Sequence, residues 1–179
     1  GPLRHRSCAV PVSLGSAMLL YGGYGAPADD ETNTDVTESV VHDDLWRYDS
    51  SDESWSEVTG TSGTSPGGRY SAACATDGTA LYVYGGLASP SGPELGTLFK
   101  YTIGTKTWSA LPSGVPASGA SMTLVDGKLV VFGGFNATSY ELSSVRIFDL
   151  GSETWTSPSV TGASLPAGRE RHVAVADPE

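Results

Sequence analysis

Three glycine doublets constrain what this chain can fold into more than any other feature of its sequence. Each doublet follows a short apolar run that ends in an aromatic residue, and the three runs end in Tyr21-Gly22-Gly23, Tyr84-Gly85-Gly86 and Phe132-Gly133-Gly134. Asp-Gly pairs precede the second and third doublets, at Asp77-Gly78 and Asp126-Gly127. Asp-Gly is typical of tight β-hairpin turns, because both turn positions tolerate positive φ. The pattern therefore predicts a repeated hairpin whose second strand ends in Gly-Gly.

An aromatic residue followed by a tryptophan seven positions later forms the second half of each repeat. The three pairs are Tyr48 with Trp55, Tyr101 with Trp108 and Phe148 with Trp155. Apolar and polar residues alternate over 45–48, 98–101 and 145–148, which is typical of half-buried strands. Each repeat is therefore expected to contain four strands. No window shows a convincing helical period, so the sequence predicts an all-β fold.

The spacing of the repeats separates a constant frame from two variable loops. The first glycines of the doublets lie 63 residues apart from Gly22 to Gly85 and 48 residues apart from Gly85 to Gly133. The extra length falls in the loops 24–43 and 59–68. We therefore expect the strands to keep their register while the loops carry what differs between repeats.

These residues resemble the kelch motif, whose repeat has a Gly-Gly doublet after an apolar strand, an aromatic residue about fifteen positions on and a tryptophan seven later, with a period of roughly 50. The resemblance implies that residues 1–179 are part of one kelch-type β-propeller domain. It implies three four-stranded antiparallel blades, at 3–60, 69–112 and 117–160, and the first strand of a fourth blade at 168–177. The doublets would allow close backbone approach, and the three tryptophans would pack between blades.

Kelch units often begin with an arginine that is followed three residues later by a histidine. Arg169 and His172 match both positions, whereas Arg4 and Arg69 match only the arginine, with Ser7 and Ala72 at the histidine position. The third unit has Gly119 near the arginine position. The resemblance implies that this arginine is structural or lines the ring of loops at one face. Arg69 and Arg169 are therefore also candidate partner contacts.

Three blades and one strand are too few to close a ring, because closed propellers have four to eight blades. An unpaired fourth-blade strand would also expose its hydrogen-bonding edge. Either the chain is a piece of a longer propeller or two chains combine, and we favour the piece. The remaining blades would then come from the same chain or from another one.

Composition and sequence patterns argue against a nucleic-acid partner, a membrane-spanning helix and a disulfide framework. The formal net charge of −10 argues against nucleic acid, because phosphate contacts are made mainly by lysine and arginine. No apolar run approaches the roughly 18 residues of a membrane-spanning helix. The two cysteines, Cys8 and Cys74, cannot form a disulfide framework, and we expect two buried thiols in preference to one bridge.

The sequence shows no pattern that would carry catalysis, so we assign no catalytic residue, cofactor or metal. The three histidines, His5, His42 and His172, lack the spacing of metal ligands, and no Gly-x-Ser-x-Gly elbow is present. Some kelch-like propellers are copper-radical oxidases, so part of a propeller oxidase of the galactose-oxidase kind is one alternative. A glycan-binding propeller is another, with Trp46 as its candidate contact.

The most distinctive feature outside the repeat is an acidic loop in the first unit. It contains the partner-binding candidates Asp29, Asp30, Glu31, Asp35 and Glu38. The resemblance places this loop on a propeller face that commonly binds partners, so we predict a non-catalytic protein-protein interaction module or scaffold. A basic partner would suit the loop; a weak calcium site and a solvated insertion are the alternatives.

One sequon for N-glycosylation, Asn136-Ala137-Thr138, directly follows the third doublet. Together with few lysines and an acidic balance, it favours an extracellular or secreted setting over a cytoplasmic one.

Overall fold

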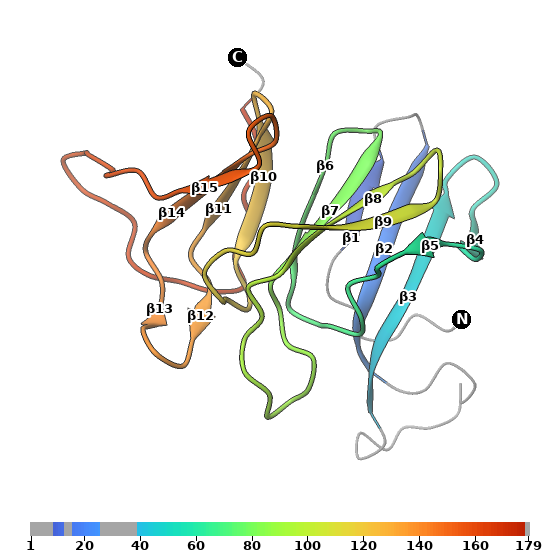
Figure 1. The fold of residues 1–179 in the computed structure, drawn as a ribbon, viewed down its shortest axis with the longest axis horizontal. Helices are drawn as coiled ribbons and strands as arrows, with labels where there is room; N and C mark the ends of the chain where they lie inside the picture. The colour runs from blue at the N-terminus through green and yellow to red at the C-terminus, as the bar shows by residue number, and fades with distance from the viewer. Residues whose placement is uncertain (1–8, 13–15, 26–38, 178–179) are drawn as a thin grey trace.

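A computed structural model describes residues 9–12, 16–25 and 39–177 of the chain (Figure 1). Every regular element in these residues is a β-strand. Three antiparallel sheets of at least four strands lie side by side, and consecutive sheets follow one another along the chain. The prediction of an all-β fold that contains three four-stranded antiparallel sheets is confirmed.

Each sheet is an up-and-down meander whose strands pair in chain order. The first sheet, blade one, contains β1 (Ala9–Val12), β2 (Ala17–Gly25), β3 (Val40–Asp49) and β4 (Ser54–Glu57). The second, blade two, contains β6 (Ala73–Thr76), β7 (Ala80–Tyr84), β8 (Leu98–Thr102) and β9 (Thr107–Leu111). The third, blade three, contains β10 (Ser121–Val125), β11 (Lys128–Phe132), β14 (Val145–Asp149) and β15 (Thr154–Thr156). A small hairpin, β12 (Phe135–Asn136) with β13 (Tyr140–Glu141), stands in the loop between β11 and β14.

A short strand from the linker after blade one covers the outer edge of blade two. This strand, β5 (Ser62–Gly63), pairs in parallel with β9, where sequence analysis expected a loop. A Cβ atom at Gly63 would lie 2.1 Å from the carbonyl oxygen of Trp108, so only glycine fits this crossing. Covering the edge of β9 removes a row of open hydrogen-bonding groups.

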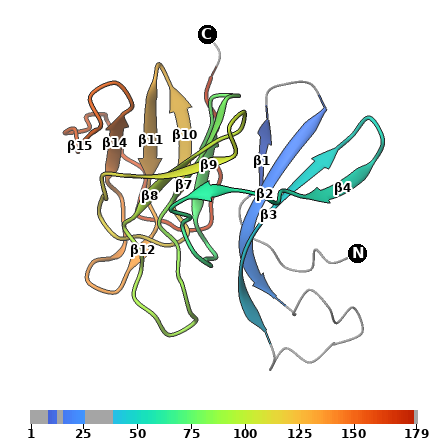
Figure 2. The same ribbon diagram turned by 45° about the vertical axis from the view of Figure 1, so that its right-hand side comes forward.

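The first strands of the three blades run next to one another. β6 packs against β1 on one side and against β10 on the other. Figure 2 shows the three sheets fanning outward from these strands, as blades do from a propeller axis. Among the four meander strands of each blade, the fourth strands, β4, β9 and β15, lie farthest from this line.

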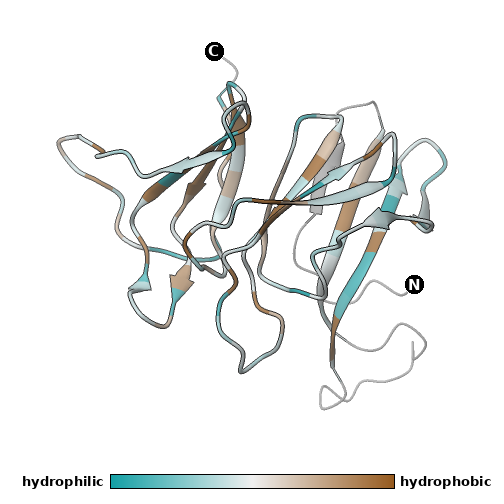
Figure 3. Ribbon diagram, in the orientation of Figure 1, coloured by the Kyte–Doolittle hydropathy of each residue, from teal (hydrophilic) through white to brown (hydrophobic). Residues whose placement is uncertain are grey.

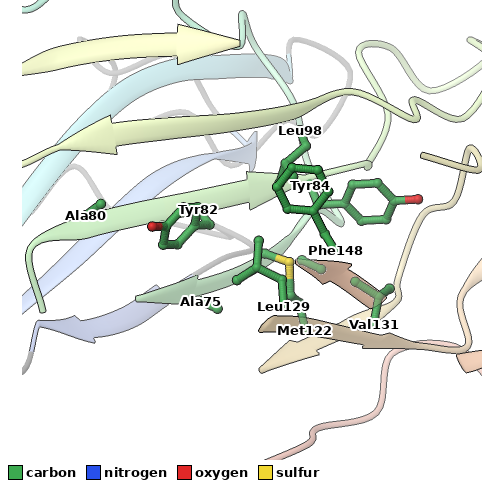
Figure 4. Packing of buried hydrophobic residues seen from close by; sticks show 10 residues of the cluster. Ala75, Ala80, Tyr82, Tyr84, Leu98, Met122, Leu129, Val131 and Phe148 are labelled. Atoms are coloured by element: carbon green, nitrogen blue, oxygen red, sulfur yellow. The ribbon is translucent and has the colours of Figure 1, made fainter. Parts of the chain in front are cut away.

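Two hydrophobic clusters fill the spaces between consecutive blades, and the apolar runs that form them appear in Figure 3. Strand β7 supplies both clusters, because its side chains alternate between its two neighbours. Leu81 and Val83 face blade one, whereas Tyr82 and Tyr84 face blade three. Figure 4 shows Tyr82, Tyr84 and Leu98 of blade two packed against the apolar residues of blade three. Blade two is therefore buried on both faces.

The repeated spacing between aromatic residue and tryptophan places one ring pair on each outer hairpin. The ring centroids of Tyr101 and Trp108 lie 4.9 Å apart, and Trp108 also lies 5.1 Å from Tyr21 of blade one. Trp155 repeats this arrangement with Phe148 at 5.2 Å and with Tyr84 of blade two at 5.1 Å. Each of these two tryptophans therefore packs between its own blade and the preceding one.

Residues 168–177 form no strand in this structure. The segment runs alongside blade three, where the side chain of His172 contacts Ser121. A first strand is completed by pairing with the second strand of its own blade, and the described residues contain no such strand next to this segment. Its assignment as the first strand of a further blade stays a prediction.

We expect Trp108→Ala to lower the free energy of unfolding by about 3–5 kcal/mol, because the buried indole fills the space between two blades. Urea unfolding measures the change. Trp55→Ala is the matched control, because Trp55 holds the same place in blade one but is half-exposed and lies against Tyr48. A loss at position 55 as large as that at position 108 would contradict this account.

The turn between β6 and β7 depends on the carboxylate of Asp77. This carboxylate accepts hydrogen bonds from the backbone of Thr79 at 2.8 Å and Ala80 at 2.7 Å, and from the hydroxyl of Tyr82 at 2.9 Å. Partial burial raises the pKa of Asp77, but the hydrogen bonds from Thr79, Tyr82 and Ala80 outweigh burial and leave the pKa below its usual value.

Since the pKa of Asp77 is lower in the folded chain, its stabilising effect is present above the unfolded pKa of about 3.9 and is lost as the pH falls through the folded value. We expect Asp77→Ala to lower the free energy of unfolding by about 1 kcal/mol at neutral pH and by less in acid. Urea unfolding at pH 7 and in acid measures both, and an equal loss in the two would refute the role of the charge.

Candidate functional site

The glycine doublets and the linkers between blades meet at one end of the three sheets. We call this end the loop face; it carries residues 85–97 and 133–144, which connect second to third strands, and the linker segments 64–72, 112–120 and 157–172. In Figure 1 it is the lower end, where the β12–β13 hairpin projects; the segment that follows β15 first extends to the side of blade three and then passes along this end. The turns within the outer hairpins lie at the opposite end.

One backbone contact joins each doublet to the start of the following unit. The N–H of the second glycine donates to a carbonyl oxygen of the next linker, from Gly23 to Arg69 at 2.8 Å, from Gly86 to Ala117 at 2.9 Å and from Gly134 to Arg169 at 2.8 Å. A Cβ on the first glycine would lie 2.5, 2.3 and 2.4 Å from these same three oxygens. All six glycines have positive φ. The doublets are therefore required by the joints between units.

These joints correct the alignment of the third unit. Ala117, not Gly119, occupies the place of Arg69 and Arg169. Gly119 instead matches Ser71 and Arg171, because all three have positive φ and the N–H of each later residue donates to the carbonyl of the earlier one, at 2.8 and 2.7 Å. The sequence placed Gly119 only near the arginine position, and the two-residue offset could not be seen without the hydrogen bonds.

The guanidinium of Arg69 is buried at the joint rather than offered to solvent. Its side chain is 3% exposed, donates to the carbonyl of Gly85 and the hydroxyl of Thr97, both at 3.1 Å, and lies 5.3 Å over the ring of Phe99. It also donates to the carbonyls of Pro66 and Gly67. Burial lowers the pKa of Arg69, but an arginine stays charged under these conditions. This geometry gives Arg69 a structural role and does not support its candidacy as a partner contact.

Arg146 supplies the same group in blade three from a different place in the sequence. Its guanidinium donates to the carbonyl of Gly133, which corresponds to Gly85, and to that of Val115, which corresponds to Gly67. It also donates to the Tyr84 hydroxyl at 3.3 Å, and the side chain is 2% exposed. Arg146 stands opposite Val131 on the neighbouring strand, just as Phe99 stands opposite Val83. The arginine has therefore moved from the linker to the third strand.

We expect Arg146→Phe to lower the free energy of unfolding by about 2–4 kcal/mol, because it leaves buried carbonyl and hydroxyl groups without a donor. Adding Ala117→Arg should recover most of that loss, since the pair then repeats the arrangement of Arg69 and Phe99. Urea unfolding of the two single variants and the double variant gives the coupling energy. If the losses in the free energy of unfolding are additive, residues 117 and 146 do not contribute to the same buried site.

The structure separates the remaining partner-binding candidates. Arg169 is exposed on the loop face, and its Nε donates to the carbonyl of Ala167 at 3.0 Å. The five acidic candidates Asp29, Asp30, Glu31, Asp35 and Glu38 lie outside the described residues. Their role stays a prediction.

The geometry of Asn136 argues against its glycosylation. Its side chain is 8% exposed, and its Nδ2, the atom to which a glycan is attached, donates to the carbonyl of Pro116 at 3.1 Å. Its Oδ1 accepts from the backbone of Thr138 and Ser139 at 3.1 and 2.7 Å. Asn136 therefore holds the β12–β13 hairpin against the neighbouring linker.

The expectation of two buried thiols is wrong, because Cys74 is disulfide-bonded. The sequence has one other cysteine, Cys8, which lies outside the described residues. Cys74 is on β6, and Cys8 directly precedes β1 in the sequence. β6 packs against β1.

Within the ranges that the structure describes, no three His, Cys, Asp or Glu side chains come close enough to hold a metal ion. His172 lies on a hollow of about 310 Å³ between β6 and β10, whose lining includes four alanines. Its Nε2 lies 2.9 Å from the Ser121 hydroxyl, and burial and Arg169 lower its pKa. None of the described segments is a helix that could cross a membrane.

Aromatic side chains that sequence analysis did not single out stand on the loop face. The rings of Tyr24 and Tyr70 lie 5.2 Å apart. Tyr140, in the β12–β13 hairpin, is 67% exposed and has φ 58°, an uncommon conformation for a bulky residue. The backbone N–H of Ala137, next to Asn136, also donates to Glu94 of blade two at 3.2 Å. The hairpin is therefore fixed on both sides and presents an exposed aromatic ring.

Repeated four-stranded blades, joined through glycine doublets, define a β-propeller segment. The sequence model of the KLHDC2/KLHL20/DRC7 Kelch-repeats domain matches residues 4–179, and the chain belongs to this family. Kelch-repeat domains are commonly protein-interaction modules.

The chain is also similar to Kelch domain-containing protein 10 of several mammals. It is 29% identical over 164 residues to that protein from Homo sapiens and from Mus musculus, covering 87% of this chain and 36% of each relative. The match to the Rattus norvegicus protein covers 39% of the relative at the same identity. The chain thus spans less than two fifths of the length of these curated relatives.

Proposed function

We propose that this chain is part of a non-catalytic protein-interaction module whose partner binds the loop face. The observation that carries the proposal is the contrast between constant joints and variable loops. The three doublet contacts repeat within 0.1 Å, from 2.8 to 2.9 Å, while the loops between them differ in length and composition. A rigid frame that displays variable loops is the arrangement by which many folds position binding residues.

The described part of the loop face offers groups suited to a protein partner. Tyr140 is exposed on a hairpin that is held by Asn136 and Glu94, so its ring is presented with little freedom to lose on binding. Aromatic residues and arginines carry much of the binding energy at protein interfaces. Arg169 is exposed on the same face.

The acidic loop would extend this surface and select the partner by charge. It connects β2 to β3, and the chain carries a net charge of −10. Complementary charge speeds association and suppresses wrong partners. We propose that the partner presents a basic surface to this loop.

The ring itself requires further blades, which we propose come from the same chain or from another one. The chain covers less than two fifths of the length of its curated relatives. Any activity of a whole protein that contains it is therefore also a proposal. The disulfide at Cys74 favours an oxidising, extracellular or secreted setting.

No observation on the described residues supports either alternative function, that of a propeller oxidase or of a glycan-binding propeller. The described residues bring together no set of groups suited to an oxidase. Trp46, the candidate glycan contact, is half-buried on β3, and its Nε1 donates to the carboxylate of Asp44 at 2.7 Å.

A photo-cross-linking amino acid placed at position 140 tests the loop face. We expect it to capture a distinct protein from an extract, because position 140 is exposed there. Deletion of residues 29–38 should reduce the yield about tenfold if the acidic loop contributes about 1.4 kcal/mol. The control carries the cross-linker at position 126, in a turn at the opposite end. Equal capture at both positions, or a yield unchanged by the deletion, would refute the proposal.

A further inference from the structure

The chain contains two Asp-Gly pairs, and each stands in the turn between the first and second strands of a blade. Asp77-Gly78 lies between β6 and β7, and Asp126-Gly127 lies between β10 and β11. An aspartate side chain reacts most readily with its own main chain when glycine follows, because glycine has no Cβ to hinder its nitrogen. As dipeptides the two pairs are equally reactive, so any difference between them comes from the fold.

The reaction is an internal condensation that needs no other reactant. The backbone nitrogen of the glycine attacks the side-chain carboxyl carbon of the aspartic acid and an N–C bond forms. The hydroxyl of the neutral carboxyl group leaves with the amide proton as water, and the product is a cyclic imide. Water then adds to one of the two imide carbonyl carbons, which gives either aspartate again or isoaspartate, in which the main chain runs through the side-chain carbons. The reaction therefore requires a free carboxyl group beside a free glycine N–H.

Both reacting groups of Asp77-Gly78 are held by hydrogen bonds. The carboxylate of Asp77 accepts from two backbone N–H groups and from the hydroxyls of Thr79 and Tyr82, at 2.7 to 2.9 Å. The N–H of Gly78 donates to Oγ1 of Thr76 at 3.0 Å, and Gly78 is buried. The carboxyl group of Asp77 therefore cannot turn toward the Gly78 nitrogen until these bonds break.

Both reacting groups of Asp126-Gly127 are free. The two residues are exposed, and within the described chain neither the carboxylate of Asp126 nor the N–H of Gly127 takes part in a hydrogen bond. The carbonyl of Gly127 accepts from the N–H of Leu150 at 3.1 Å, which leaves the nitrogen of Gly127 open. A Cβ added to Gly127 would meet no atom within 4 Å, so there is room around this residue.

The position of this turn allows it to open without unfolding the blade. Asp126 and Gly127 follow the last pair of the β10–β11 ladder, Val125 with Lys128, and all four residues are exposed. The φ angle of Asp126 is 47°, a value that is uncommon for a residue other than glycine. A hairpin tip with few buried contacts opens locally at low cost. The Asp126 carboxyl group can then reach the Gly127 nitrogen while the rest of blade three stays folded.

We propose that Asp126 is a site of spontaneous conversion to isoaspartate in the folded protein, and that the same reaction is suppressed at Asp77. The conversion adds one carbon to the main chain of a two-residue turn. The longer turn no longer matches the pairing of Val125 with Lys128, so this pair is the first to be lost in the modified chain. The turn lies at the end of blade three opposite the loop face, so the proposal does not depend on a partner there.

Peptide mapping by mass spectrometry tests the proposal on the full chain after prolonged incubation at neutral pH. The two sites fall on different tryptic peptides, because Lys100 and Lys106 lie between them. Electron-transfer fragmentation distinguishes isoaspartate from aspartate in each peptide. We expect isoaspartate to accumulate at least about tenfold faster at position 126 than at position 77, because the hydrogen bonds on Asp77 add to the barrier there.

The same chain unfolded in urea is the matched control, and there both positions should react at similar rates. Asp126→Ser, which cannot form the imide, should abolish the product at position 126. Tyr82→Phe combined with Thr76→Ala should raise the rate at position 77, because it frees one bond on each reacting group. The proposal is overturned by equal rates at the two positions in the folded chain, by conversion at position 126 only after unfolding, or by an unchanged rate at position 77 in the double variant.

Discussion

One backbone hydrogen bond determines how each blade follows the one before it. The second glycine of a doublet donates to the carbonyl of the residue that opens the next unit, while the first glycine passes the same carbonyl closer than any side chain allows. Main-chain atoms make this contact, so its geometry is independent of the surrounding side chains. The inter-blade rings and the buried guanidinium groups then occupy the space that this contact sets. For this reason the strands keep their register while the loops vary.

The features that sequence analysis predicted correctly are those encoded by residues close together in the chain. Gly85 and Gly86 follow an apolar run directly, and Trp108 lies seven positions after Tyr101, so local spacing was sufficient to predict the four-stranded repeat. The features that it missed depend on contacts between distant segments. β5 requires the edge of β9, some 45 positions away at Ser62 and Thr107, and the bonded state of Cys74 could not be told from the spacing of two cysteines.

The candidate site shows the same difference between features encoded by neighbouring residues and features that depend on distant contacts. A sequon can be found in three consecutive residues, but the group that occupies the Asn136 amide is the carbonyl of Pro116, at a sequence separation of 20. Arg69 matched the arginine position of the repeat, yet the sequence could not show that its guanidinium is buried. The exposed ring of Tyr140 had no sequence signal at all, because the residue lies outside the repeated positions.

The exchange between Ala117 and Arg146 has a consequence for recognising repeats of this kind. When a repeat is compared with the motif position by position, Ala117 counts as a mismatch and Arg146 counts as an unrelated strand residue. Arg146 keeps a cation beside the carbonyl of Gly133 although the linker has Ala117 in place of an arginine. The repeat therefore retains the spatial position of the charge but not the sequence position of the arginine. Repeats that have lost the arginine of their linker can therefore be searched for by asking whether another residue reaches the same carbonyl.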